Sequence, residues 1–144
     1  MPAMASIFSR ILDGELPGRF LWTDPEAVAL LDVRPLHPGH ALVIPRREVD
    51  QWPDLEPGLA SHLMMVAHRL ARAQRSVIAC QRVGLLIAGF EVPHVHLHVI
   101  PVDGMGDFDF SRAETNPDQA ELDRVAQLLR DELRRTGGGD HVPG

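Results

Sequence analysis

The feature that most constrains this chain is residues 93–101, where histidine alternates with apolar residues between two prolines. Strict alternation is typical of a β-strand, because successive side chains of a strand point to opposite faces of the sheet. We therefore expect His94, His96 and His98 on one face, roughly 6.6 Å apart along the strand at a rise of about 3.3 Å per residue. The apolar side chains between and after them should face the core; they are Val95, Leu97 and Val99.

Other parts of the chain predict further short strands and two helices that cover them. Extended apolar runs bounded by turn residues indicate strands at 19–23, 28–33, 40–44, 83–88 and 92–100. Helical spacing of apolar residues indicates a short helix that ends before Asp13-Gly14 and a long helix over residues 57–78. This order of elements predicts an α+β fold with a largely antiparallel five-stranded sheet.

The C-terminal part predicts one more helix. Asn116 as the cap and Pro117 at the first helical position indicate a helix over about 117–135. Residues 136–144, which include three consecutive glycines, are expected to form a flexible tail. The length of 144 residues favours a single domain over residues 1–144.

Charge and cysteine content limit the classes of partner. The formal net charge is −6, which disfavours binding to nucleic acid or to an anionic membrane. No apolar run is long enough to span a bilayer, and the start of the chain lacks the pattern of a signal peptide. The single cysteine, Cys80, cannot form an internal disulfide, so we expect a cytoplasmic protein.

Three chemical interpretations of the histidine face remain open at the level of residues. In the first interpretation, the three histidines form a solvated polar face that has no function. Two histidines at positions i and i+2 of a strand can ligate zinc, but a site would also need His40 or Glu91, because the chain has no second cysteine. Alternatively, a neutral imidazole attacks phosphorus and forms a covalent intermediate that water releases, while neighbouring histidines donate hydrogen bonds to the phosphate oxygens.

Residues 94–100, His-Val-His-Leu-His-Val-Ile, match the signature of the histidine-triad (HIT) superfamily. Residues 6–11, 31–35 and 38–45 resemble the opening segment, the ribose-side strand and a Gly-His-containing strand of that family, in the same order. The resemblance covers a core of about residues 6–103. It implies the HIT fold and a homodimer with one continuous sheet, in which the long helix and central strands of two subunits meet.

The resemblance also implies the site. His96 would be the nucleophile that takes up the nucleotidyl group, and His98 would donate to the phosphate oxygens. His94 and His40 would complete the phosphate site, and Asp32 would bind the ribose hydroxyls. The apolar wall around a purine base would be Ile7, Phe8, Ile11, Leu31 and Val33.

The N-terminal segment and the strands resemble the Hint-like bacterial branch of nucleoside phosphoramidases. We therefore expect hydrolysis of a nucleotidyl phosphoramidate or phosphoanhydride, with no cofactor and no metal. A dinucleoside polyphosphate hydrolase, or a nucleotide-binding module with weak or no turnover, remains the alternative. Ser6, Ser9 and Glu48 stand where some members bind a structural zinc, and Phe90 stands where relatives have a glutamine that holds phosphate. We expect this phenylalanine, which cannot form hydrogen bonds through its side chain, to weaken turnover. His37, His62, His68 and His141 are expected to lie outside the site.

Overall fold

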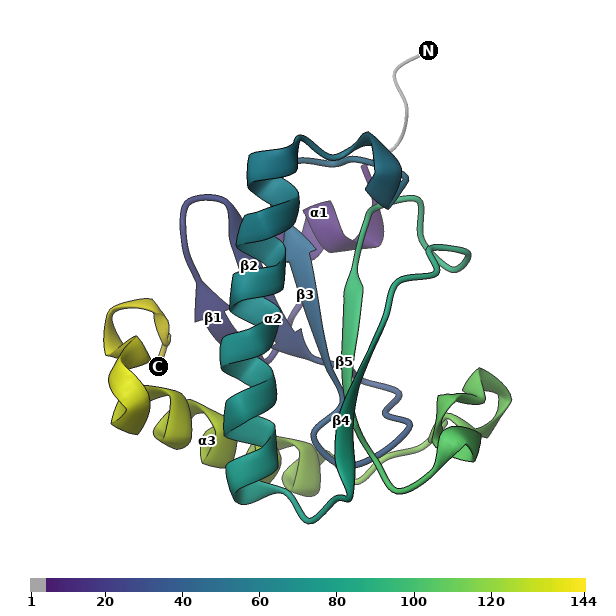
Figure 1. The fold of residues 1–144 in the computed structure, drawn as a ribbon, viewed down its shortest axis with the longest axis vertical. Coiled ribbons are helices and arrows are strands. Elements are labelled where there is room, and N and C mark those ends of the chain that lie inside the picture. Colours follow the sequence, from purple (N-terminus) through teal and green to yellow (C-terminus); the bar gives the residue numbers. More distant parts are fainter. Residues whose placement is uncertain (1–4) are drawn as a thin grey trace.

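A computed structural model describes residues 5–144. It contains a single five-stranded sheet in the order β1-β2-β3-β5-β4, and every neighbouring pair of strands is antiparallel. The strands are β1 (Phe20–Thr23), β2 (Ala27–Leu31), β3 (Ala41–Pro45), β4 (Arg82–Leu86) and β5 (Leu97–Val102). The α-helices are α1 (Ile7–Leu12), α2 (Pro57–Val77) and α3 (Gln119–Leu133). This architecture, drawn in Figure 1, confirms the predicted α+β fold.

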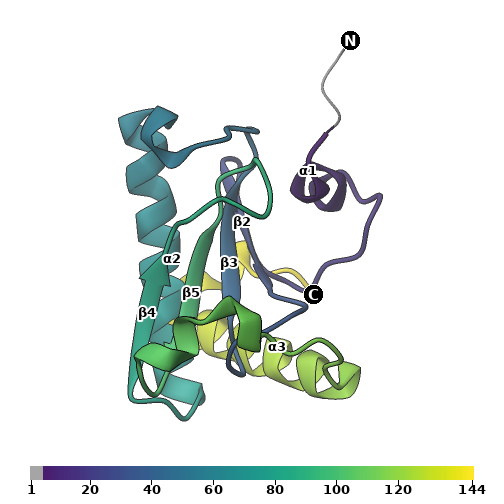
Figure 2. The same cartoon turned by 90° about the vertical axis from the view of Figure 1, so that its right-hand side faces the viewer.

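The two faces of the sheet carry different helices. The long helix α2 and the C-terminal helix α3 pack on one face, where their apolar stripes meet the sheet in the main core. The short helix α1 lies on the opposite side, as Figure 2 shows. There Phe8 packs against alternate residues of β2 and β3 in a second, smaller cluster: Val28, Leu30, Leu42 and Ile44. The period of two along each strand sends neighbouring side chains to the two faces.

Helix α2 is joined to the sheet by a polar contact as well as by its apolar stripe. Gln74 is completely buried, and its Nε2 donates to the carbonyl oxygens of Gly39 (2.8 Å) and Val99 (2.9 Å). These bonds connect the helix to the turn before β3 and to β5. They hold β5, which carries His98, beside the turn that leads into β3.

Strand β5 begins later than the sequence predicts. Regular pairing starts at Leu97, so His94 lies in a bend before the strand and His96 in the irregular segment that follows the bend. The strand also continues through Pro101 rather than stopping there. Pairing with β3 ends at Val99, so Pro101 pairs with β4 alone. The N–H that proline lacks therefore interrupts no hydrogen bond to β3.

The C-terminal segment differs from prediction at both ends. The cap of α3 is Asp118, whose carboxylate accepts from the backbone N–H of Ala120, and not Asn116. The segment predicted to be a flexible tail forms helical turns at Arg134–Gly138 and Gly139–His141. His141 stacks on Trp22 of β1, with ring centroids 4.5 Å apart. A contact with a ring that is distant in sequence therefore holds this tail, and local sequence cannot reveal such a contact.

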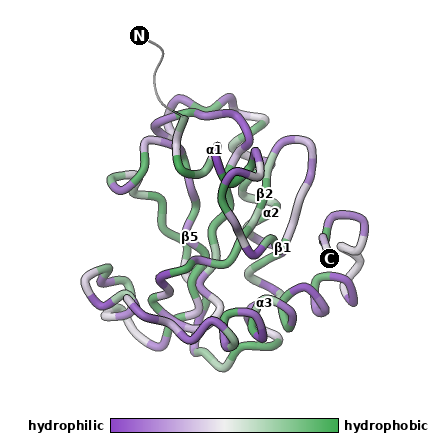
Figure 3. Tube along the Cα trace, turned by 180° about the vertical axis from the view of Figure 1, so that it is seen from behind, coloured by the Kyte–Doolittle hydropathy of each residue, from purple (hydrophilic) through white to green (hydrophobic). Residues whose placement is uncertain are grey.

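Figure 3 shows hydrophilic residues interrupting the hydrophobic ones along α3, as expected for a helix with one face on the core. Its buried side includes Leu122, Val125, Leu129 and Leu133. Among the described residues, none of the helices combines the length and the hydropathy that a bilayer crossing requires.

Candidate functional site

A cavity of about 350 Å³ opens on the α1 side of the sheet. The residues that line it come from α1, the end of β2, β3, the start of β5 and the turns after β5. The polar side chains at its wall are Asp32, Arg34, Glu91, His96 and His98. Two of the three predicted triad histidines therefore face the cavity, and His94 lies behind them, fully buried.

His96 is held with one ring nitrogen available. Its Nδ1 lies 2.8 Å from the carbonyl oxygen of His94, which can only accept, so Nδ1 carries the proton and donates. In the neutral form of this ring, Nε2 keeps its lone pair, and it lies 3.5 Å from Oε2 of Glu91 at the cavity wall. Phe8 of α1 contacts the ring edge-on, with centroids 4.9 Å apart, and fixes its plane. A neutral imidazole in this orientation can act as a nucleophile.

His94 supports this arrangement from behind. Its Nε2 donates to the carbonyl oxygen of Pro45 at 2.8 Å, and its Nδ1 accepts from the hydroxyl of Ser6 at 2.6 Å. Ser6 is also the N-cap of α1, because its oxygen accepts from the backbone N–H of Ser9. Burial lowers the pKa of His94, so the ring is neutral. The histidine therefore links β3, α1 and the nucleophile.

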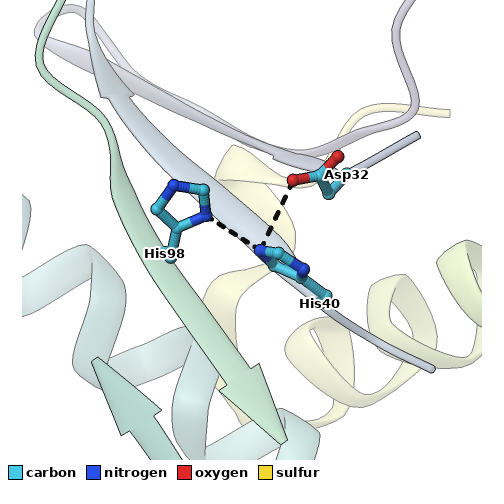
Figure 4. A group of neighbouring side chains, drawn as sticks. All are labelled: Asp32, His40 and His98. Atoms are coloured by element: carbon cyan, nitrogen blue, oxygen red, sulfur yellow. Dashed lines mark hydrogen bonds and ion pairs between the residues drawn. The ribbon is translucent and has the colours of Figure 1, made fainter. Parts of the chain in front are cut away.

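His98 has the opposite orientation of its proton. The backbone N–H of Leu36 donates to Nδ1 of His40 at 3.0 Å, so the His40 proton is on Nε2. That nitrogen lies 2.9 Å from Nδ1 of His98, to which it donates (Figure 4). The His98 proton is therefore on Nε2, a buried atom that has no partner within the described chain. This N–H is a ready donor to an oxygen bound in the cavity.

Burial keeps the His40–His98 pair neutral. It lowers the pKa of His40 to about 3 and that of His98 to about 4, and each is lowered further by a neighbouring histidine. Near pH 7, both rings are thus uncharged, and the order of donors and acceptors from Leu36 to His98 is fixed. We call Leu36, His40 and His98 the histidine relay.

Asp32 follows β2 and points toward the relay. One carboxylate oxygen accepts from the backbone N–H of Arg34 at 2.9 Å, and the other lies 3.4 Å from Nε2 of His40 (Figure 4). Burial raises the pKa of this carboxyl group, although the Arg34 N–H and nearby charges oppose the shift. Since Asp32 also lines the cavity, its oxygens can accept hydroxyl groups of a ligand.

Four of the five residues predicted for the apolar wall line the cavity, and one does not. Ile7, Phe8, Ile11 and Val33 line the cavity. Leu31 instead belongs to the core beneath α2, because it points to the face opposite Leu30. Leu30 and Leu42 line the cavity in its place. The alternation along β2 could have identified Leu30 from sequence, since Asp32 and Leu30 must share a face.

Comparison with known proteins gives one consistent result. The sequence profile of the HIT domain matches residues 13–105. An uncharacterised HIT-like protein of Mycobacterium tuberculosis is 35% identical over 103 residues, which cover 68% of this chain and 72% of that protein. A zinc-bound histidine triad family protein from Mycobacterium smegmatis has a TM-score of 0.78 at 27% identity, covering 94% of this chain and 98% of that one.

The chain belongs to the HIT family. Its similar proteins include nucleotide hydrolases. The adenosine 5'-monophosphoramidase of Saccharomyces cerevisiae is 36% identical over 99 residues, or 67% of this chain and 62% of that enzyme. The bifunctional bis(5'-adenosyl)-triphosphatase/adenylylsulfatase of Arabidopsis thaliana is 35% identical over 98 residues, or 65% of this chain and 54% of that enzyme.

The residues of this HIT protein do not fit a structural zinc near α1. Glu48 accepts from the backbone N–H of Ser6 at 2.6 Å and from the hydroxyl of Ser9 at 2.9 Å. These bonds lower the pKa of Glu48, first through the Ser6 N–H. Zinc sites use thiolate, imidazole and carboxylate ligands. Here the Ser6 hydroxyl already serves the helix cap and His94, and the Ser9 hydroxyl donates to Glu48. A hydrogen-bonded network thus ties α1 to the triad.

Two other groups bring potential ligand atoms within 4.8 Å of one another: Asp32, His40 and His98, and Glu91, His96 and His98. A histidine binds a metal ion through a ring nitrogen that has a free lone pair. In the first group, Nε2 of His40 carries a proton, and in the second, Nε2 of His98 does. The histidine relay would have to be broken before either group could bind a metal.

The loop before the triad places Glu91 at the cavity, and not Phe90, the residue that the sequence singled out. Phe90 is 95% exposed and does not line the cavity, whereas the next residue, Glu91, does. A second aromatic residue that the motif did not reveal, Phe110, contacts His98 edge-on, with centroids 4.9 Å apart. Phe110 lies beyond the region matched by the HIT profile, and no signal in the sequence points to it.

Proposed function

We propose that this HIT protein hydrolyses a purine nucleotide conjugate, preferably a nucleoside phosphoramidate, through a covalent nucleotidyl intermediate on His96. One observation carries the proposal: a single cavity holds His96, whose Nδ1 proton leaves Nε2 as the nucleophilic nitrogen of the neutral ring, beside His98, whose Nε2–H has no partner among residues 5–144. A nucleophile and a donor to phosphate are the two groups that nucleophilic attack at phosphorus requires.

The reaction has two steps. In the first, the lone pair on Nε2 of His96 forms a bond to the α-phosphorus and the bond from phosphorus to the leaving amine breaks. The amine nitrogen keeps the electron pair of that bond and takes a proton from solvent water as it leaves. The Nε2–H of His98 donates to a phosphate oxygen as negative charge develops there. In the second step, water replaces His96 on phosphorus and releases the nucleoside monophosphate.

The other cavity residues suit the nucleoside. The Asp32 carboxylate can accept the ribose hydroxyls, and Ile7, Ile11 and Val33 offer apolar surface to a purine base. The similarity to the yeast monophosphoramidase supports an amine leaving group. The similarity to the Arabidopsis triphosphatase supports a nucleotide leaving group instead, so the test compares both.

We also propose that two copies of the chain form a homodimer along strand β4. This strand is an edge of the sheet, so its outer N–H and C=O groups are available to a second copy. Exposed apolar side chains lie on β4 and α2: Leu85, Met64 and Met65. Sedimentation equilibrium tests this proposal, and a monomer at micromolar concentration would contradict it.

The decisive experiment for the activity uses an adenosine phosphoramidate. Rapid quenching in base followed by intact mass measurement should show one nucleotidyl group on the wild-type protein and none on the His96→Ala variant. A His68→Ala variant is the matched control, because His68 is exposed on α2. A diadenosine polyphosphate is run in parallel. Binding of AMP without turnover of either substrate would overturn the hydrolase in favour of a binding module.

A further inference from the structure

The proposed second step requires a group that accepts a proton from the attacking water molecule. Water that attacks the nucleotidyl-histidine must lose a proton, and a neutral water molecule is a poor nucleophile until a base takes it. The base must line the cavity, carry a free lone pair at neutral pH and not be engaged elsewhere.

Most polar groups at the cavity wall fail this requirement. Nε2 of His96 is bonded to phosphorus in the intermediate, and Nε2 of His98 already carries a proton. Arg34 is a permanent cation and cannot accept a proton. Asp32 accepts from the Arg34 N–H and faces His40, on the side where the ribose is proposed to bind.

Glu91 is the group that remains. Its Oε2 lies 3.5 Å from Nε2 of His96, the atom that carries the nucleotidyl group. Within residues 5–144, no hydrogen bond engages its carboxylate, and the side chain is 47% exposed. It is therefore open to water and can turn toward the face of the phosphorus from which water approaches.

The loop positions Glu91 by exposing its neighbour. The segment between β4 and β5 turns at Gly89, which has a φ of 83°, a value that favours glycine. After this turn, Phe90 points into solvent and Val92 packs against the α1-side cluster. Glu91, between them, faces the cavity.

The geometry points to Glu91 as the general base that activates water for release of the nucleotide from His96. This inference rests on the proposed function. In the step, the Glu91 carboxylate takes a proton from water, the water oxygen forms a bond to phosphorus, and the bond from phosphorus to Nε2 breaks. The electron pair returns to His96, and Glu91 leaves the step protonated and passes its proton to solvent.

The test separates the two half-reactions in a Glu91→Gln variant, which keeps the shape of the side chain and removes its basicity. With an adenosine phosphoramidate, the variant should form the adduct at the wild-type rate. It should then release AMP about 10²-fold more slowly, the lower end of the usual contribution of a general base. Glu56→Gln, a substitution of an exposed carboxylate at the start of α2, is the matched control and should behave as wild type.

A second readout distinguishes a base from a structural role. Hydroxylamine attacks phosphorus without first losing a proton, so it should discharge the adduct of Glu91→Gln as fast as that of the wild type. A merely distorted site would be slow with both nucleophiles.

The outcomes are distinct. If the wild type forms no adduct, the proposed function fails and this inference fails with it. If the wild type turns over and Glu91→Gln releases AMP equally fast, only the inference is overturned. It is also overturned if the variant slows adduct formation as much as release, or if hydroxylamine fails to rescue it.

Discussion

Nε2 of His40 lies 2.9 Å from Nδ1 of His98 and donates to it, because the Leu36 N–H already occupies the other nitrogen of His40. A backbone amide thus determines which nitrogen of His98 faces the cavity with a proton. The same principle operates on the nucleophile, where the carbonyl oxygen of His94 determines the tautomer of His96. Two adjacent imidazoles consequently have opposite roles.

Replacing His40 should damage catalysis more than binding. In His40→Ala, Nδ1 of His98 loses its donor, so the His98 proton is no longer confined to Nε2. We expect kcat to fall by about 10²-fold, the scale of removing one preorganised donor, while KM changes little. Steady-state kinetics check the rate, and ¹⁵N chemical shifts report the tautomer of His98. A single Nε2–H tautomer in the variant would contradict the role given to the relay.

Acid should destabilise the fold because the relay is buried in its neutral form. The pKa of His40 is lowered to about 3 and that of His98 to about 4, mainly by burial. Below the ordinary histidine pKa of about 6.5, the unfolded chain binds protons that the folded chain does not. Stability is therefore expected to be full above pH 6.5 and to fall as pH drops toward 4, by about 1.4 kcal/mol per pH unit for each group.

Urea unfolding at a series of pH values measures this loss. The exposed-histidine variant His68→Ala should show the same dependence as the wild type. A stability that stays constant between pH 7 and pH 5 would show that these two histidines are not held neutral.

Ser6 should matter more than Ser9, although both belong to the network around Glu48. Ser6→Ala removes the N-cap of α1 and the donor to His94, while Ser9→Ala removes an exposed bond to Glu48 and a 3.4 Å contact with the Ser6 hydroxyl. We expect a loss of about 1–2 kcal/mol for Ser6→Ala and less than about 0.5 kcal/mol for Ser9→Ala. Thermal denaturation of both variants provides the comparison, and equal losses would rule out a special role for Ser6.

Phe110 should control water access to His98. Its ring covers His98 edge-on, and burial is the main cause of the lowered pKa of that histidine. In Phe110→Ala, the pKa of His98 is expected to rise toward its ordinary value, as measured by an NMR titration of the ring protons. Phe90→Ala is the matched control, because Phe90 is almost fully exposed and should leave that pKa unchanged. The reverse pattern would place Phe90 over the site.

Local patterns in the sequence predicted which histidines lie together. Alternation placed His94, His96 and His98 on one side of the chain, because the period of two depends only on the extended backbone. The same rule, applied to β2, excludes Leu31 from the cavity once Asp32 faces it. The strand boundary depends on the partner strand: β5 begins at Leu97 because β3 pairs with nothing earlier.

The tail and the cavity wall depended on contacts between distant segments. His141 is held by stacking on Trp22, and Arg69 of α2 lies 5.4 Å from the same ring. Phe110 reaches His98 through two short helical turns after β5. Neither contact follows from the residues next to these aromatic rings.

The sequence by itself determined the fold class and the histidine motif, because periodicity and short motifs act through neighbouring residues. Only the tertiary structure decided what each histidine can do. The proton of His94 is placed by Pro45, 49 positions earlier, and that of His98 by His40, 58 positions earlier. A tautomer is fixed by whichever donor or acceptor lies opposite each ring nitrogen, and folding brings those partners together.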